Sequence, residues 1–213
     1  MAWDDIPEWA NDVTNSILQT VKKKDPFTFY HCCRVGIGSR KLAKAMGLNE
    51  FEQTVLEFSG LFHDIGKVGI PDDILLKPGK LTAEEVDIMK VHPIKSAEII
   101  DPLSHIPFFR FLLPGIRYHH ERIDGNGYPF NLIGERIPLP ARVIAVVDSF
   151  DAMTNRRPYR EPLSESKVIK ELVDYSGSQF DANIVKVFLE ALPHFRDEQA
   201  PEDLVTTQLL KAA

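Results

Sequence analysis

The sequence predicts an all-α fold, because most of its segments read as helices whose ends can be identified. Apolar residues recur at helical spacing, capping residues precede several segments, and stretches rich in glycine and proline separate them. With 213 residues the chain can bury a sizeable core, and 44% apolar and 26% charged residues are typical of a globular protein. We therefore expect one helical domain with short arms.

The first two helices are expected near the N-terminus. Residues 1–24 read as an amphipathic helix, which could pack on the core, pair with a second copy of the chain or continue from a sensory domain. Asp25 and Pro26 suit an N-cap and a first-turn proline, and Gly47 suits the position just past a helix end. A second helix is therefore predicted from Asp25 toward Met46.

Two capping boxes indicate where the next helices begin. Asn49 is followed three residues later by Glu52, and Thr82 is followed in the same way by Glu85. At this spacing each side chain can accept a hydrogen bond from the backbone amide of the other residue. The helix that begins after Asn49 is expected to end near Gly66.

Later segments are also assigned to helices. Residues 141–150 contain a β-branched run that propensity alone would assign to a strand. A lone strand would lack partners in a helical chain, so we expect a buried helix. Ser164 and Asp181 are candidate caps for two further helices, and the second of these is expected to stop before Pro193.

Two segments rich in glycine and proline, residues 66–80 and 121–140, are expected to be irregular. Loops of this length inside a compact domain are often lids or binding loops. The predicted organisation is an N-terminal arm over residues 1–24, a domain over residues 25–193 and a C-terminal tail over residues 194–213 that could be helical.

Charge, hydropathy and cysteine usage exclude several classes of protein. The net charge of −6 argues against general binding to a nucleic acid polymer. The apolar run over residues 143–147 is too short to span a membrane and the N-terminus is acidic, so a cytoplasmic protein without membrane association is expected. Adjacent Cys32 and Cys33 lie too close together for the usual disulfide span and are expected to be small apolar residues of a helix.

Histidines and aspartates near helix ends and loops make up a candidate metal site. His63 and Asp64 fall near a helix C-terminus, which tolerates a bound cation, and the two oxygens of Asp64 could bridge two metal ions. Asp148 lies in an apolar run, where its burial would be costly without a cation or donors. The other candidate ligands are His31, His92, His119 and His120. Taken singly, His31 or His92 would better suit a hydrogen-bonded structural histidine.

This set supplies nitrogen and oxygen ligands without a thiolate, which suits iron, manganese, nickel, cobalt or zinc and does not choose among them. Two metal ions about 3.5–4 Å apart can activate a bridging hydroxide and neutralise the charge that develops during attack on phosphorus. The ligands alone therefore predict a metal-dependent hydrolase of phosphate esters.

Longer stretches of the sequence resemble one known family. Residues 63–67 (HDIGK) resemble the signature of the HD-domain phosphohydrolases, and residues 119–129 (HHERIDGNGYP) resemble the extended signature of its HD-GYP subfamily. Shorter matches lie at residues 77–82, 92–93, 137–139, 142–148 and 157–160. The resemblance covers residues 25–193 and implies an HD-domain helical bundle with long loops around a binuclear metal site.

The same resemblance implies a phosphodiesterase that hydrolyses cyclic di-GMP to the linear dinucleotide pGpG and, in some members, on to GMP. One metal ion would be held by His31, His63, Asp64 and Asp148, and the other by Asp64, His92, His119 and His120. Iron is the expected metal. Phe27 stands where some members place a glutamate that helps to hold a third metal, so two metal ions are expected.

The resemblance also assigns residues to the reaction and the substrate. Asp64 and Lys67 would be the catalytic residues, with Lys67 near the scissile phosphate as a charge stabiliser or proton donor. The substrate-binding residues would be Lys67, Gly127, Tyr128, Arg157 and Arg160. Guanidinium groups suit both phosphates and guanines, although the two arginines could also lie in a solvated loop.

Alternative functions remain open at this point. The enzyme could act on 3',3'-cyclic GMP-AMP, which would need only a different base pocket. It could also be a slow-turnover sensor that binds a cyclic dinucleotide and docks a signalling protein through residues 121–140. The loop that contains Tyr128 argues against HD-domain enzymes that act on guanosine polyphosphates or dNTPs. A homodimer is compatible with all of these functions.

Overall fold

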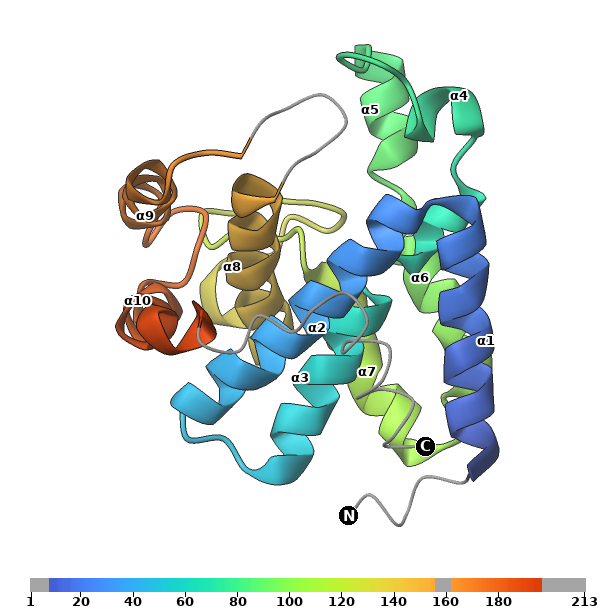
Figure 1. The fold of residues 1–213 in the computed structure, drawn as a ribbon, viewed down its shortest axis with the longest axis horizontal. Helices are drawn as coiled ribbons and strands as arrows, with labels where there is room; N and C mark the ends of the chain where they lie inside the picture. Colours follow the sequence, from blue (N-terminus) through green and yellow to red (C-terminus); the bar gives the residue numbers. More distant parts are fainter. Residues whose placement is uncertain (1–7, 156–161, 197–213) are drawn as a thin grey trace.

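The structure is a computed structural model that describes residues 8–155 and 162–196. The α-helices of these ranges are α1 (Glu8–Lys24), α2 (Pro26–Ala45), α3 (Glu50–Phe62), α4 (Asp72–Leu75), α5 (Ala83–Met89), α6 (His92–Ile100), α7 (Pro107–Tyr118), α8 (Leu139–Thr154), α9 (Glu165–Asp174) and α10 (Ala182–Arg196). Between them lie the 3-10 helices η2 (Ile65–Gly69), η3 (Asp101–Leu103) and η4 (Gly134–Arg136). Across the described ranges no strand forms and only isolated β-bridges occur, so the all-α prediction is confirmed (Figure 1).

Most of the predicted helix starts are confirmed by the side chains that cap them. The Asp25 carboxylate accepts from the amide of Phe27 at the start of α2. Both capping boxes form, one at Asn49 before α3 and one at Thr82 before α5. Ser164 occupies the N-cap position of α9 but makes no capping hydrogen bond. These local signals therefore depend on short-range chemistry that the sequence already contains.

Two predicted helix ends differ from the structure. Helix α10 runs through Pro193 to Arg196, so the predicted stop was wrong. A proline removes one helical hydrogen bond, and the buried Phe188 and Leu192 hold this last part of α10 against the core. Helix α3 ends at Phe62, before Gly66, because a 3-10 helix takes over at Ile65.

Of the two segments expected to be irregular, residues 66–80 contain most of η2 and all of α4, so that expectation was wrong for part of the segment. Residues 121–138 form a long loop with only η4 and a bridge between Asp124 and Ile133. Residues 141–150 lie within α8, which confirms the helix predicted there in spite of its β-branched run. Cys32 and Cys33 are free and buried in α2, as predicted.

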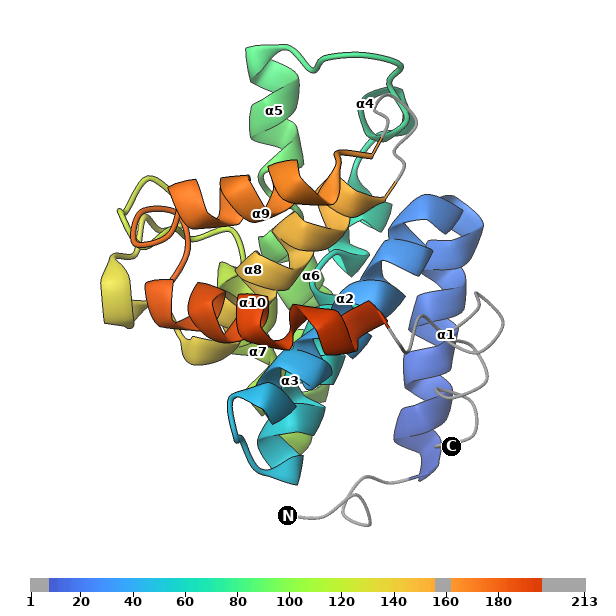
Figure 2. The same ribbon diagram turned by 60° about the vertical axis from the view of Figure 1, so that its left-hand side comes forward.

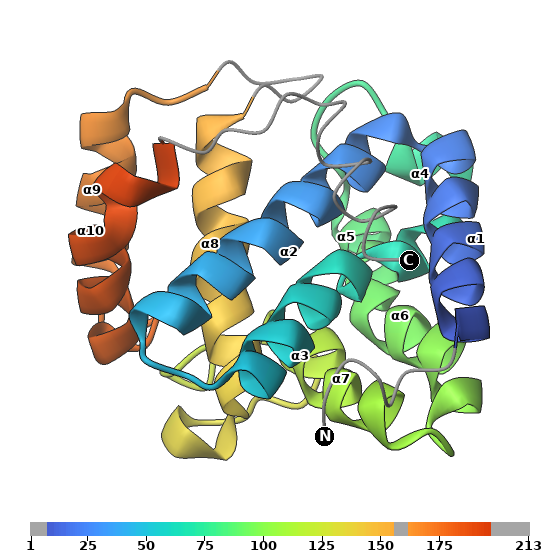
Figure 3. The same ribbon diagram turned by 60° about the horizontal axis from the view of Figure 1, so that its bottom comes forward.

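Helix α2 separates two apolar clusters, and Figures 1 and 3 show α1 on one side of it and α9 and α10 on the other. On one side, Phe29 and Cys33 of α2 pack with residues of α1, α3, α6 and α7. On the other side, Val35 and Leu42 pack with residues of α8, α9 and α10. Because α2 contributes to both clusters, side chains near its middle reach the interior of the molecule.

Helix α1 packs on the core through the buried Leu18 and Val21, which answers one question that the sequence left open. It begins at Glu8, and residues 1–7 and 197–213 lie outside the described part of the chain. The division into an arm, a domain and a tail stays a prediction. Among the described helices, none is both long enough and apolar enough to cross a membrane.

The chain makes a close backbone contact where η2 meets α6, the helix that Figure 2 labels between α8 and α2. A Cβ atom at Gly66 would lie 2.3 Å from the carbonyl oxygen of His92 and 2.4 Å from the amide nitrogen of Ser96. The amide of Gly66 also donates to Ser96 Oγ at 2.8 Å. The start of α6 can therefore approach η2 only because residue 66 has no side chain.

We expect Gly66→Ala to lower the free energy of unfolding by about 1–3 kcal/mol or more, because the added methyl group meets backbone that cannot rotate away. Urea denaturation monitored by circular dichroism measures this change. Gly69→Ala is the matched control in the same 3-10 helix, because its Cβ would meet only the flexible side chain of Lys95. Equal destabilisation by both substitutions would contradict the close-contact explanation.

Candidate metal centre

The buried carboxylate of Asp64 is surrounded by four histidine side chains. Asp64 Oδ1 lies 2.9 Å from His92 Nε2 and 4.0 Å from His119 Nε2. Asp64 Oδ2 lies 3.3 Å from His63 Nε2 and 3.5 Å from His31 Nε2. The two oxygens therefore face two different pairs of imidazoles.

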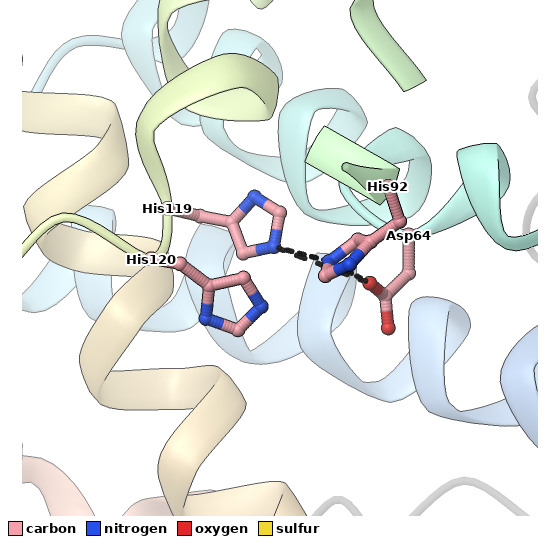
Figure 4. Close-up of side chains that lie close together, drawn as sticks. All are labelled: Asp64, His92, His119 and His120. Atoms are coloured by element: carbon pink, nitrogen blue, oxygen red, sulfur yellow. Dashed lines mark hydrogen bonds and ion pairs between the residues drawn. The ribbon is translucent and has the colours of Figure 1, made fainter. Parts of the chain in front are cut away.

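The predicted ligands fall into two groups that share Asp64. One group contains Asp64, His92, His119 and His120, and the other contains His31, His63 and Asp64. Within each group the candidate ligand atoms lie within 4.8 Å of one another. Figure 4 shows the first group, with His119 and His120 side by side after α7 and His92 between them and Asp64.

Hydrogen bonds to the backbone fix the orientation of three of these rings. The Nδ1 atoms of His63, His92 and His119 lie 2.6, 2.8 and 2.8 Å from the carbonyl oxygens of the residues three positions earlier. A carbonyl can only accept, so each Nδ1 carries the hydrogen and each Nε2 is left with a lone pair. Each of these lone pairs therefore lies on the side of its imidazole ring that faces Asp64.

This arrangement brings several acceptor atoms close together. A cation bound between them would remove the repulsion between their lone pairs. The Nε2 atoms of His92 and His119 are 3.4 Å apart, and neither has a hydrogen to donate. His63 Nε2 is buried and has no hydrogen-bond partner among the described residues. Donor atoms bound to one metal at about 2.1 Å would be separated by distances of this order. The residues present therefore fit a divalent metal ion in each group.

The charge states of the site suit the same interpretation. Burial lowers the pKa of His119 well below its usual range and that of His120 to about 3, so both rings are neutral at pH 7. Burial favours a protonated Asp64, but the opposing charge of the Lys67 ammonium group helps to hold the pKa of that carboxyl well below its usual range. Lys67 Nζ donates to Asp64 Oδ2 at 2.5 Å, so this lysine lies at the edge of the cluster.

The position of His31 depends on two aspartates of α8. Its Nε2 lies 3.1 Å from Asp148 Oδ1, which places the predicted Asp148 beside the His31 group. Its Nδ1 donates to Asp151 Oδ2 at 2.7 Å. Burial favours a neutral ring, but the hydrogen bonds to Asp148 and Asp151 raise the pKa of His31 to about 9. Sequence reasoning missed Asp151, although its place three residues after Asp148 on one helix was a signal that both carboxylates share a face.

The loop after α7 is held against the site by Glu121. The buried Glu121 carboxylate accepts from the amides of Phe130 and Leu132 at 2.7 and 2.9 Å, a role that the sequence did not reveal. A Cβ at Gly127 would lie 2.4 Å from the amide nitrogen of Arg122, so the loop folds back closely on its own start. The ring of Tyr128 then stacks on His120 at 4.7 Å between ring centroids.

A cavity of about 320 Å³ opens beside His119 and His120. Its lining includes Lys90, Arg122, Tyr128 and Asp148. Arg122 is held by Asp124 and Gln179, whereas Lys90 lies 5.9 Å from the centre of the Tyr128 ring. The predicted substrate residues Gly127 and Tyr128 thus border the cavity. The predicted Arg157 and Arg160 lie outside the described residues.

Comparison with known proteins gives a consistent result. The model of the HD domain family matches residues 15–184. A cyclic di-GMP phosphodiesterase of Thermotoga maritima is 42% identical over 167 residues, which are 78% of this chain and 45% of that protein. A 3'3'-cGAMP-specific phosphodiesterase of Vibrio cholerae is 34% identical over 191 residues, which are 90% of this chain and 36% of that protein. The chain therefore spans less than half the length of these relatives.

The fold is also similar to that of a solved structure. The crystal structure of a cyclic GMP-AMP specific phosphodiesterase of Vibrio cholerae superimposes with a TM-score of 0.68 at 18% identity. The match covers 94% of this chain and 53% of that one. At this level of identity the comparison shows a shared helical architecture.

We expect Glu121→Ala to lower the free energy of unfolding by about 1–3 kcal/mol, because the amides of Phe130 and Leu132 lose their acceptors. Hydrogen exchange should quicken at these two amides, and Glu121→Gln, which keeps one acceptor oxygen, should have a smaller effect. Glu135→Ala, an exposed change in the same loop, serves as the control. Unchanged exchange at both amides in Glu121→Ala would contradict the role given to this carboxylate.

Proposed function

This chain belongs to the HD domain family, and on that premise we propose that it is a two-metal phosphodiesterase that hydrolyses a cyclic dinucleotide. The observation that carries the proposal is the position of Asp64. One of its oxygens faces His92 and His119, and the other faces His31 and His63. A carboxylate placed in this way can bridge two metal ions.

The first metal ion would be held by His31, His63, Asp64 and Asp148, and the second by Asp64, His92, His119 and His120. Such a pair supplies an activated water and neutralises charge on a phosphate under attack. Iron is the metal that we propose, with manganese, nickel, cobalt and zinc as alternatives that suit the same ligands. Phe27 stacks near His31 at 6.5 Å between ring centroids and has no ligand atom, which favours two metal ions rather than three.

The residues around the cluster would bind and orient the substrate. The ammonium group of Lys67 lies against Asp64, where it could stabilise charge on the scissile phosphate or donate a proton to the leaving oxygen. Tyr128, held on His120, borders the cavity in which part of the dinucleotide would lie. Arg157 and Arg160 remain the proposed contacts for phosphates and guanines on the strength of their sequence positions alone.

Cyclic di-GMP is the proposed substrate, because the Thermotoga maritima relative at 42% identity is a cyclic di-GMP phosphodiesterase. The Vibrio cholerae relative makes 3',3'-cyclic GMP-AMP the second candidate. Purification without oxygen, metal analysis and a product assay with both dinucleotides would decide between them and show whether hydrolysis continues to GMP. The exposed Phe130 and Ile133 on the loop after α7 offer a surface for a signalling partner.

We expect Asp64→Ala to lose both metal ions and all phosphodiesterase activity, because it removes a ligand common to the two groups. Metal content by mass spectrometry and product formation from cyclic di-GMP measure the two losses, and circular dichroism should still report a helical protein. Asp12→Ala, an exposed change on α1, should keep metal and activity. Full activity in Asp64→Ala would refute the two-metal site.

Lys67→Met should separate catalysis from metal binding. The variant keeps much of the side chain's length but loses its charge, so we expect kcat for cyclic di-GMP to fall by about 10²–10³ while both metal ions remain bound. Steady-state kinetics and metal analysis of one preparation test this expectation. If the metal ions were lost with the activity, Lys67 would be supporting the metal site instead of the reaction.

A further inference from the structure

The ring of His31 is held differently from the other orientated rings of the cluster. His63, His92 and His119 each donate from Nδ1 to a neutral backbone carbonyl of their own segment. His31 instead donates to the carboxylate of Asp151, which lies 120 positions away on α8. An anionic partner therefore supports only one of the two ligand groups among these contacts.

Asp151 is itself fixed in place by donors from two helices. Arg34, one turn after His31 on α2, donates from Nε to Oδ1 at 2.7 Å and from Nη2 to Oδ2 at 3.0 Å. Asn155, just after α8, donates to Oδ1 at 2.8 Å. The Asp151 side chain is 8% exposed. A carboxylate with these contacts and this burial cannot turn away from His31 without leaving several donors unpaired.

The chemical consequence lies at the other nitrogen of the ring. A carboxylate that accepts from Nδ1–H increases the basicity of Nε2 and fixes the ring orientation, and loss of such a partner commonly weakens metal binding about 10–100-fold. Backbone carbonyls orient a ring in the same way but bring no net charge. Asp151 should thus strengthen the His31 group relative to the group of His92, His119 and His120.

From this asymmetry we propose that Asp151 is a positioning residue that makes the His31–His63–Asp64 group the tighter metal site, which fills first. The inference rests on the proposed two-metal function and adds an order of binding to it. It gives Arg34 a different role from that of Asp151: the arginine joins the carboxylate to α2, His31 and Asn155 still hold the carboxylate without it, and only the carboxylate acts on the metal ligand.

A simpler explanation is that Asp151 and Arg34 form an ion pair that joins α8 to α2 and has no effect on the metal site. The two explanations differ in what they predict for the partners. If the pair were only structural, neither substitution would weaken one metal site more than the other. If Asp151 positions His31, its loss should weaken one metal site selectively, and the loss of Arg34 should not.

The test is a titration of the metal-free protein with Mn²⁺, in which calorimetry measures binding and electron paramagnetic resonance monitors the bound ions. The wild type should bind in two steps, with the spectrum of an isolated ion at one equivalent and that of a coupled pair at two. Asp151→Asn should weaken the first step about 10–100-fold and leave the second within about threefold. Arg34→Gln should lower thermal stability but keep the first step within about threefold.

Two equal steps in the wild type, an unchanged first step in Asp151→Asn, or equal weakening by Arg34→Gln would each overturn the proposal. If Asp151→Asn does not fold, the order of filling can be read from ligand variants. His120→Ala should keep the tight step and His31→Ala should lose it, and the opposite pattern would refute the proposal. A wild type that binds no Mn²⁺ would count against the proposed function itself, which distinguishes that failure from this one.

Discussion

The arrangement of the molecule around its site follows from one constraint, the burial of the Asp64 carboxylate. An anion at this depth needs compensation, and here the ammonium group of Lys67 supplies part of it, while imidazoles from several helices surround the carboxylate. His31 comes from the second turn of α2, His92 from the start of α6 and His119 from the end of α7. These side chains can reach one carboxylate only if the helices pack as they do. The packing of the core therefore also determines the geometry of the site.

Helix ends provide much of the precision of the site. His63 and His119 follow the last residues of α3 and α7, and His92 follows the end of α5 closely. The last carbonyl groups of a helix lack partners within that helix, and each of these rings uses such a group to fix its own orientation. The same hydrogen bond that satisfies a helix end thus selects the tautomer that can bind a metal. His31, in the interior of a helix, has no free carbonyl within reach and relies on Asp151 instead.

The sequence predicted those parts of the structure that depend on local chemistry or on spacing. The caps at Asn49 and Thr82 were predictable because each acts within four residues. That the histidines and aspartates lie close together was predictable because they stand in the same order as in the family that the chain resembles. Asp151 was not identified, because its partner His31 lies on another helix and the spacing of Asp151 from Asp148 does not by itself indicate that partner. The passage of α10 through Pro193 was missed for a related reason: tertiary packing of Phe188 and Leu192 outweighs a local breaking signal.

The contact at Gly66 has a consequence for how the site can vary over evolutionary time. Because η2 and α6 meet at Gly66 through close backbone contacts and one hydrogen bond to Ser96 Oγ, the separation between Asp64 and His92 depends on the main chain at this point. The outer surface of α6 can therefore accumulate substitutions while the ligand spacing stays the same. The close approach of the two segments that carry these ligands thus depends on the absence of a single methyl group.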